Sequence, residues 1–364
     1  MMRAPKSFAV VVRRRDGTLH VRERAVVEKP RGLVRLPFVR GVASLVESLR
    51  MGSEALRFSA EQFETDLAAA GVGAFGAFGL TLFVIVTAAD GAGPAIGKPK
   101  RSGAGGLLLL ALMVGFLVAL PQGAAAGLNR VLGLGLPVQS AAFQAITGGL
   151  KLAIVVGYLL AIRRVPDIRR VFQYHGAEHK TISTYEAGEP LTVANARAKT
   201  TLHPRCGTTF LVMVVMVSIV IFSVLGAALP RIQTGSAVMD NILFFGLKLP
   251  FLPVLVAVTF ELQRLFARYC LVGPMRLLLW PGFLVQKITT AEPDDAELEV
   301  ALASLRVTLF RDEDSRPNAS ANANGTANES ANEPASEDDV RFADYGALLA
   351  ARTLRSPAPP LTAM

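Results

Sequence analysis

The chain has 364 residues, of which 51% are hydrophobic and only 18% charged, and its mean hydropathy is +0.41. Because soluble domains average about 25% charged residues, this composition excludes an ordinary soluble globular protein and favours a large lipid-facing surface. The net charge of +9 would suit a nucleic-acid partner, but the basic residues flank the apolar segments, as they do in the cytoplasmic loops of membrane proteins, so we expect no nucleic-acid binding.

The chain begins with a predicted β unit and an amphipathic helix. In residues 1–36, two runs of β-forming residues flank Asp16-Gly17, which is a hairpin turn signal. The unit is too short to form a core of its own. Residues 37–66 show helical periodicity, with charges on the face opposite the apolar residues. We expect this helix to lie in the membrane interface or to pack beneath the spans.

Five apolar segments with few charges follow, and each approaches the length of about 20 residues that crosses a bilayer. The segments are residues 71–89, 105–125, 141–162, 208–229 and 242–260. The third carries Lys151 at its centre, and a central lysine costs about 2.5–3.5 kcal/mol on insertion scales. We therefore expect four full spans and one partial one. The predicted fold is a mainly α, multi-pass helical bundle of four to five spans, with membrane segments in 67–163 and 208–272.

The C-terminal part is predicted to leave the membrane. Residues 273–310 predict an interfacial helix anchored by Trp280 and then a short acidic, amphipathic helix. Residues 311–364 are rich in Asn, Ala, Ser and Glu and predict a disordered tail, with a short helix near 340–352. Together with the basic loops, this pattern indicates a bacterial inner (cytoplasmic) membrane protein surrounded by membrane lipids, with the polar loop 164–207 on the cytoplasmic side.

The polar loop carries a histidine pair. Pro166 predicts the start of a helix and Gly188 its end. His175 and His179 are four residues apart, so both imidazoles lie on one helix face and could bind one ion at about 2.0–2.1 Å. With Glu178 they form His-x-x-Glu-His, which has the form of the inverted zincin signature. The alternative is a pair of core histidines that bond to backbone carbonyls.

A second pair of ligand types follows in His203-Pro-Arg-Cys206, a turn before the fourth apolar segment. Two spaced ligand pairs are what a tetrahedral metal site needs. We therefore predict that His175, His179, His203 and Cys206 hold a divalent ion, most simply Zn²⁺. Glu186 is an alternative ligand if Cys206 is a core residue. Cys206 and Cys270 are far apart in the chain, so no disulfide is expected.

Other charged residues surround this motif. The basic residues could anchor the loop to anionic lipid headgroups, or they could attract an anionic substrate such as a phospholipid headgroup or a phosphate ester. They are Arg163, Arg164, Arg169, Arg170, Lys180, Arg197 and Arg205. Glu261, at the end of the last apolar segment, is predicted to form an ion pair with Arg264.

At these motifs the chain resembles a bacterial integral-membrane family of unknown function, the YqhQ-like proteins, which are described as candidate metal-dependent enzymes. The resemblance covers about residues 1–309, and the family begins with a Gly-rich segment, so we expect this chain to lack part of the start. The family has Arg-Gly-Pro where this chain has Arg3-Ala4-Pro5. The matching stretches are 2–7, 36–41, 165–181, 185–190, 202–208 and 290–295. The resemblance implies a membrane location and a metal, and names no substrate.

Two functions fit these observations. The first is a membrane-embedded, metal-dependent enzyme, expected to be hydrolytic on a membrane-associated or anionic substrate, with Glu178 as the general base. The second is a non-enzymatic membrane protein, a transporter or an assembly scaffold, whose loop is held by a structural metal. A closed four-ligand site favours the second, since such sites are usually structural. An open coordination position favours the first.

Overall fold

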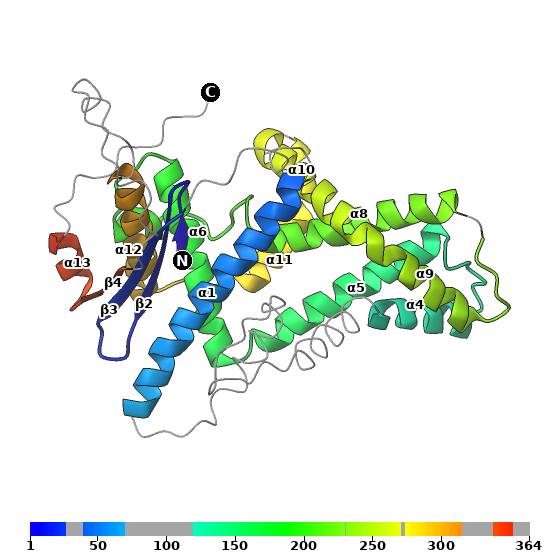
Figure 1. Cartoon of the computed structure of the whole chain (residues 1–364), viewed down its shortest axis with the longest axis horizontal. Helices are drawn as coiled ribbons and strands as arrows, with labels where there is room; N and C mark the ends of the chain where they lie inside the picture. Colours follow the sequence, from blue (N-terminus) through cyan, green and yellow to red (C-terminus); the bar gives the residue numbers. More distant parts are fainter. Residues whose placement is uncertain (27–38, 70–118, 230, 271–273, 315–337, 352–364) are drawn as a thin grey trace, which may run out of the picture.

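Three helices of the computed structural model are long and apolar enough to cross a membrane (Figure 1). The structure describes residues 1–26, 39–69, 119–229, 231–270, 274–314 and 338–351. The three helical stretches are α5 (Ala141–Ile162), α8 (Gly207–Ala228) and Val238–Tyr269. The last comprises α9 (Ala237–Lys248) from its second residue, a 3-10 turn (Leu249–Phe251) and α10 (Leu252–Tyr269).

The expected number of spans is not confirmed within these residues. The predicted segment 71–89 and most of 105–125 lie outside the described residues, and α4 (Leu120–Val131) is shorter than a span. The segment predicted as a partial span, α5, is a helix of 22 residues with Lys151 inside it. Length and composition therefore allow α5 to cross a membrane completely.

The spans approach each other closely at small residues. A Cβ added at Gly148 of α5 would lie 2.4 Å from the side chain of Ile219 on α8, and one at Gly226 would lie 2.3 Å from the carbonyl oxygen of Gln139. Glycine at such positions lets apolar helices pack backbone to backbone. The pairs α5–α8 and α8–α10 are therefore tight contacts and hold the membrane helices as one bundle.

The N-terminal strands belong to a four-stranded antiparallel sheet in the order β1-β2-β3-β4. The first three strands are β1 (Met2–Arg3), β2 (Ser7–Arg13) and β3 (Leu19–Ala25). Gly17, at φ +90°, forms the expected turn, and Asp16 Oδ1 accepts a hydrogen bond of 2.9 Å from the Thr18 N–H. The predicted hairpin is thus part of a larger sheet.

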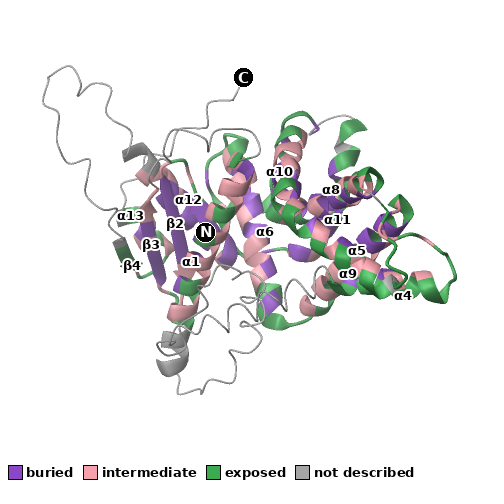
Figure 2. Cartoon of the chain, turned by 45° about the vertical axis from the view of Figure 1, so that its right-hand side comes forward, coloured by how far each residue is buried: buried purple, intermediate pink, exposed green. Residues whose placement is uncertain are grey.

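The sheet is covered on both faces. Ala9 and Val11 pack against α12 (Asp295–Asp314), while Phe8 and Val10 pack against α1 (Val39–Ala69). Successive residues of a strand point to opposite faces, so two covered faces require the unbroken apolar run of β2. Figure 2 shows the buried sheet between these helices. The strands are too few to form a hydrophobic core by themselves, and the two helices complete that core.

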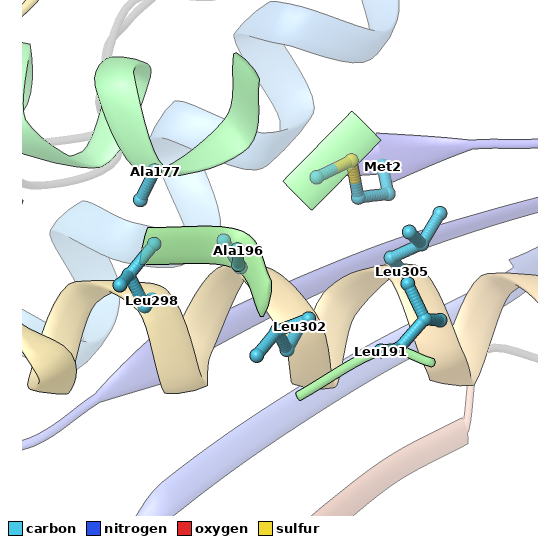
Figure 3. Close-up of a cluster of buried hydrophobic side chains, with 8 residues drawn as sticks. Met2, Ala177, Leu191, Ala196, Leu298, Leu302 and Leu305 are labelled. Atoms are coloured by element: carbon cyan, nitrogen blue, oxygen red, sulfur yellow. The ribbon is translucent and has the colours of Figure 1, made fainter. Parts of the chain in front are cut away.

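The helix α12, which the sequence predicted as short, acidic and amphipathic, is a core helix that is buried on two faces. Its Leu298, Leu302 and Leu305 pack toward Ala177 of α6 (Pro166–Glu186), as Figure 3 shows, together with α7 (Val193–Arg197) and Met2. Its opposite face, including Val300 and Val307, packs on the sheet. A helix with apolar residues on two faces shows only a weak amphipathic pattern in its sequence, because the periodicity of one face obscures that of the other.

The expectation of a disordered tail is wrong for residues 338–342, whereas a short helix lies where one was expected, near 340–352. Asp338–Phe342 forms β4, which pairs with β3 in the register Val21↔Val340, and α13 (Tyr345–Ala351) follows. Phe342 and Leu348 join the core between the sheet and α12. A strand of five residues in a polar segment cannot be recognised from its own sequence, since it is ordered by pairing with a strand more than 300 residues away.

The helix α1 joins the two parts of the molecule. A Cβ at its Gly41 would lie 3.0 Å from Phe260 of α10, and its Phe58 is buried against the sheet. Arg40 forms two hydrogen bonds of 2.6 and 2.5 Å with the carboxylate of Glu261. The structure thus gives Glu261 a partner on α1, where the sequence predicted Arg264 on its own helix.

Segments from three regions of the sequence lie at one end of the three apolar helices. The sheet, the loop with α6 and α7, and α12 share one hydrophobic core, and they lie at the left of Figure 1. The turn between α8 and α9 lies at the opposite end, at the right. If the helices cross a membrane, the N-terminal sheet and the polar loop must be on the same side.

We therefore expect single cysteines at Asp16 and Ala187 to react with a membrane-impermeant thiol reagent from the same side, and a cysteine at Gln233 to react from the other. All three positions are exposed. The unmodified chain is the control, because Cys206 and Cys270 are buried. Labelling of Asp16→Cys and Ala187→Cys from opposite sides would contradict this topology.

Candidate metal centre

The helix α6 positions the histidine pair as the sequence predicts. It begins at Pro166 and ends at Glu186, and Gly188, at φ +69°, follows its last turn. Its buried face includes Phe172, Gly176 and His179. The rings of His175 and His179 lie on one face with their centroids 4.5 Å apart. Both imidazoles therefore point into the protein.

Cys206 meets this face from the start of α8. It is the N-cap residue of α8, and its Sγ accepts a hydrogen bond of 3.5 Å from the Thr208 N–H. The Sγ lies 3.2 Å from Nε2 of His175. Within the described residues, His175, His179 and Cys206 each offer a ligand atom, and these atoms lie within 4.8 Å of one another.

The other ring nitrogen of each histidine is held by a backbone carbonyl. Nδ1 of His175 lies 2.9 Å from the carbonyl oxygen of Thr289, and Nδ1 of His179 lies 2.5 Å from that of Thr201. A carbonyl can only accept, so each Nδ1 carries a proton, and Nε2 is the ring nitrogen left to face a ligand. This is the arrangement found for most metal-binding histidines. Two core histidines satisfied by carbonyls would not also need to share a thiol.

His175 and Cys206 shift each other's pKa, and His179 adds to the shift of Cys206. Burial disfavours the imidazolium form of His175, but the hydrogen bond with Cys206 and the attraction of its thiolate outweigh burial and raise the pKa of His175 to about 9. Burial raises the pKa of the Cys206 thiol, but hydrogen bonds with His175 and His179 outweigh it and lower this pKa to about 5. Cys206 is thus held as a thiolate, the form of cysteine that binds metals.

His203 lies beside the cluster but has other partners. Its ring centroid is 5.8 Å from that of His179. Its Nε2 lies 3.3 Å from Glu186, and its Nδ1 accepts a hydrogen bond of 3.4 Å from the N–H of Arg205. Glu186, the alternative ligand, also bonds the Arg205 guanidinium at 2.6 Å. Three of the four predicted ligands therefore converge, and the fourth faces a carboxylate.

Glu178, the predicted general base, lies on α6 between the two histidines. Its carboxylate helps to raise the pKa of His175. Its Oε1 lies 2.6 Å from the amino group of Met1, and its side chain is 31% exposed. The Glu178 carboxylate is therefore near enough to His175 to affect its charge, and it is paired with the Met1 amine at the surface.

Several of the surrounding cations have carboxylate partners. Lys180 is buried and contacts Glu292, and Arg197 pairs with Asp295. These contacts tie α6 to the segment before α12 and α7 to the first residue of α12. Arg164 and Arg169 at the start of α6 are exposed and have no carboxylate within ion-pair distance among the described residues. They are the cations best placed to meet an anionic headgroup.

Sequence reasoning missed the residues that support the site through hydrogen bonds. Gln286 of α11 (Trp280–Thr289) is fully buried, accepts a hydrogen bond of 2.8 Å from the His203 N–H, and donates to the His203 carbonyl at 2.7 Å and to Thr209 at 2.6 Å. A glutamine inside an apolar helix is the one sequence signal for this role. Thr201 and Thr289 act through backbone carbonyls, which no side-chain pattern reveals.

Gly176 allows α6 to approach the backbone at Ala291, just after α11. A Cβ on Gly176 would lie 2.2 Å from the carbonyl oxygen of Ala291, and the Ala291 N–H donates to Phe172 at 2.9 Å. We expect Gly176→Ala to destabilise the protein by about 1–3 kcal/mol through overpacking, which corresponds to roughly 2–4 °C per kcal/mol in the unfolding midpoint. Gly52→Ala in α1, which meets no atom within 4 Å, is the control and should stabilise the helix slightly. An unchanged midpoint for Gly176→Ala would contradict this packing.

The comparisons with known proteins agree with the resemblance noted in the sequence. The chain is similar to the uncharacterized protein YqhQ of Bacillus subtilis (strain 168), with 27% identity over 328 residues that cover 85% of this chain and 91% of that protein. No solved structure matches the chain significantly. The family described as "Protein of unknown function (DUF1385)" matches residues 36–310, which include every candidate site residue. The chain therefore belongs to the DUF1385 family.

Proposed function

We propose that this protein is a membrane-embedded enzyme that binds a divalent metal ion, most simply zinc, through His175, His179 and Cys206, and that it hydrolyses a membrane-associated or anionic substrate. The observation that carries the proposal is the shared orientation of the two histidines. Each Nδ1 is fixed by a carbonyl, and the other nitrogen of each ring is directed toward one thiolate.

The donor set fits zinc in type and spacing. Imidazole nitrogen and thiolate sulfur are the donors that zinc prefers in proteins. Two such donors around a tetrahedral zinc ion lie about 3.3–3.6 Å apart, given bond lengths of about 2.0–2.3 Å. The 3.2 Å between Nε2 of His175 and Sγ of Cys206 is close to this separation. Small side-chain shifts would therefore suffice to accommodate the ion.

Three protein ligands favour a catalytic site over a structural one. Catalytic zinc usually has three protein ligands and leaves the fourth position to water, whereas structural sites are filled by four. A metal in such a site supplies a water molecule of lowered pKa. Glu178, three residues after His175, is suited to accept a proton in that reaction. Arg164 and Arg169 support a substrate with an anionic headgroup.

The second candidate is a transporter or an assembly scaffold with a structural metal. It is favoured by the way the cluster joins α6 of the loop to the N-cap residue of α8. If His203 turned from Glu186 to the metal, the site would be closed and would act as a clamp. The metal content and the stability of variants separate the two candidates.

We expect the purified protein to contain one zinc ion per chain, and His175→Ala and Cys206→Ser each to remove it. His203→Ala should keep the metal, because the ring of His203 faces Glu186. Cys270→Ser is a matched control, since Cys270 is a buried free cysteine at the end of α10. Metal analysis by mass spectrometry measures each content. Retention of zinc by Cys206→Ser would reject the three-ligand site.

We expect Glu178→Gln to keep the metal and the unfolding midpoint while it abolishes complementation of a strain that lacks the protein. The amide preserves the shape of the carboxylate, and loss of a general base typically lowers the rate by about 10²–10⁴-fold. Glu189→Gln, on the exposed turn after α6, is the control. If Glu178→Gln instead lost metal and became less stable, the structural clamp would be favoured, because metal binding contributes to folding free energy.

A further inference from the structure

A small polar cavity lies among the apolar helices, away from the metal centre. Side chains of α4, α5, α8 and α9 line it, including Gln122, Lys151, Ser218 and Lys248. Its volume is about 20 Å³, by a measure in which one water molecule needs about 10–15 Å³. Ser218 is twelve residues beyond Cys206 along the chain, which corresponds to about 18 Å along a helix. The cavity is therefore distinct from the His/Cys cluster.

Lys248 is held in the wall of this cavity by two amide oxygens. Its side chain is 4% exposed, and its Nζ donates hydrogen bonds of 3.0 Å to Gln122 and 2.9 Å to Gln144. Both amides are fixed by their own donor groups, which bond to the carbonyl oxygens of Asn241 at 2.8 Å and Val138 at 2.6 Å. The two oxygens are thus directed at the amine.

Two aromatic rings complete the surroundings of Lys248. Its Nζ lies 5.2 Å from the ring centroid of Phe222 and 4.7 Å from that of Phe244. Ring faces and amide oxygens attract a cation, and this attraction is stronger in a desolvated site than at a surface. These contacts therefore favour the ammonium form of Lys248, although burial inside the helix bundle disfavours it.

Lys151 of α5 is a second basic group at the same cavity. Within the described part of the chain, no carboxylate lines the cavity, and neither lysine has a carboxylate within ion-pair distance. Two like charges in a medium of low dielectric repel each other, and each charge costs several kcal/mol to desolvate without a partner. Charged residues inside a membrane usually mark a binding site or an ion pathway.

We propose that this cavity binds a small monovalent anion of about the size of chloride, which offsets one of the two positive charges of the paired lysines Lys151 and Lys248. The cavity volume limits the ligand, because a space for one or two water molecules is too small for a phosphate ester. The close approach of Gly148 to Ile219 limits expansion of the wall between α5 and α8. The site does not depend on the metal centre.

The test uses the purified full-length protein in a neutral detergent, with sodium chloride, bromide or gluconate at constant ionic strength. We expect chloride and bromide to raise the unfolding midpoint in a saturable way and gluconate to have no effect. The chloride NMR line should broaden with the protein and sharpen when bromide competes. Lys151→Met should weaken chloride binding at least tenfold, while Lys287→Met, the same change at an exposed lysine of α11, should leave it unchanged.

Equal midpoints in chloride and gluconate, with no specific line broadening, would overturn the proposal. Stabilisation by phosphate, or by anionic lipid in nanodiscs, without an effect of chloride would also overturn it, since the ligand would then be larger. The broadening and its reversal by bromide are measured on the unmodified chain, so the test holds even if Lys151→Met does not fold.

Discussion

Helix α12 buries two opposite faces, and the segments that it contacts come from both ends of the chain. One face packs on α6 and α7, and the other packs on the sheet. Ser7 donates a hydrogen bond of 2.6 Å to the carbonyl of Thr308, which fixes β2 on the helix. A fully buried leucine side chain contributes about 1.5–3 kcal/mol, so the leucines of α12 alone favour this arrangement strongly. Because the shared core must lie on one side of the apolar helices, it determines where the loop with α6 is placed.

The metal centre inherits its rigidity from this core. Thr289, whose carbonyl holds His175, lies shortly before α12, and Ala291 meets Gly176 at backbone distance. On the opposite side of the site is Cys206, the N-cap residue of the apolar helix α8. The ligands therefore come from a helix packed on the core and from the start of a membrane-length helix, and neither depends on a free loop. Such fixed side chains are what a pre-organised site requires.

Local patterns in the sequence predicted α6, its two ends and the common face of its histidines, because each depends on residues within one helix. What they could not predict is the direction of side chains on a turn. His203 and Cys206 are separated by a short turn, and one faces Glu186 while the other faces His175. The pairing of β4 with β3 and the bond between Arg40 and Glu261 also escaped, since their partners are hundreds of residues apart. Periodicity in the sequence indicates which face of an element is apolar, but it does not identify the element that packs on that face.

Lys151 shows why hydropathy alone underestimates the capacity of α5 to cross a membrane. Its insertion cost argued for a partial span, on the assumption that the side chain meets lipid. In the structure Lys151 faces a cavity lined by amides and hydroxyls, while α8, which forms another wall, turns Met216, Val220 and Val224 outward. Helix α8 thus has two different faces, with an exposed apolar stripe on one and Ser218 toward the cavity on the other. A polar cavity shared by several helices reduces the cost of each buried charge, so a lysine at mid-span indicates a site between helices as readily as an interrupted span.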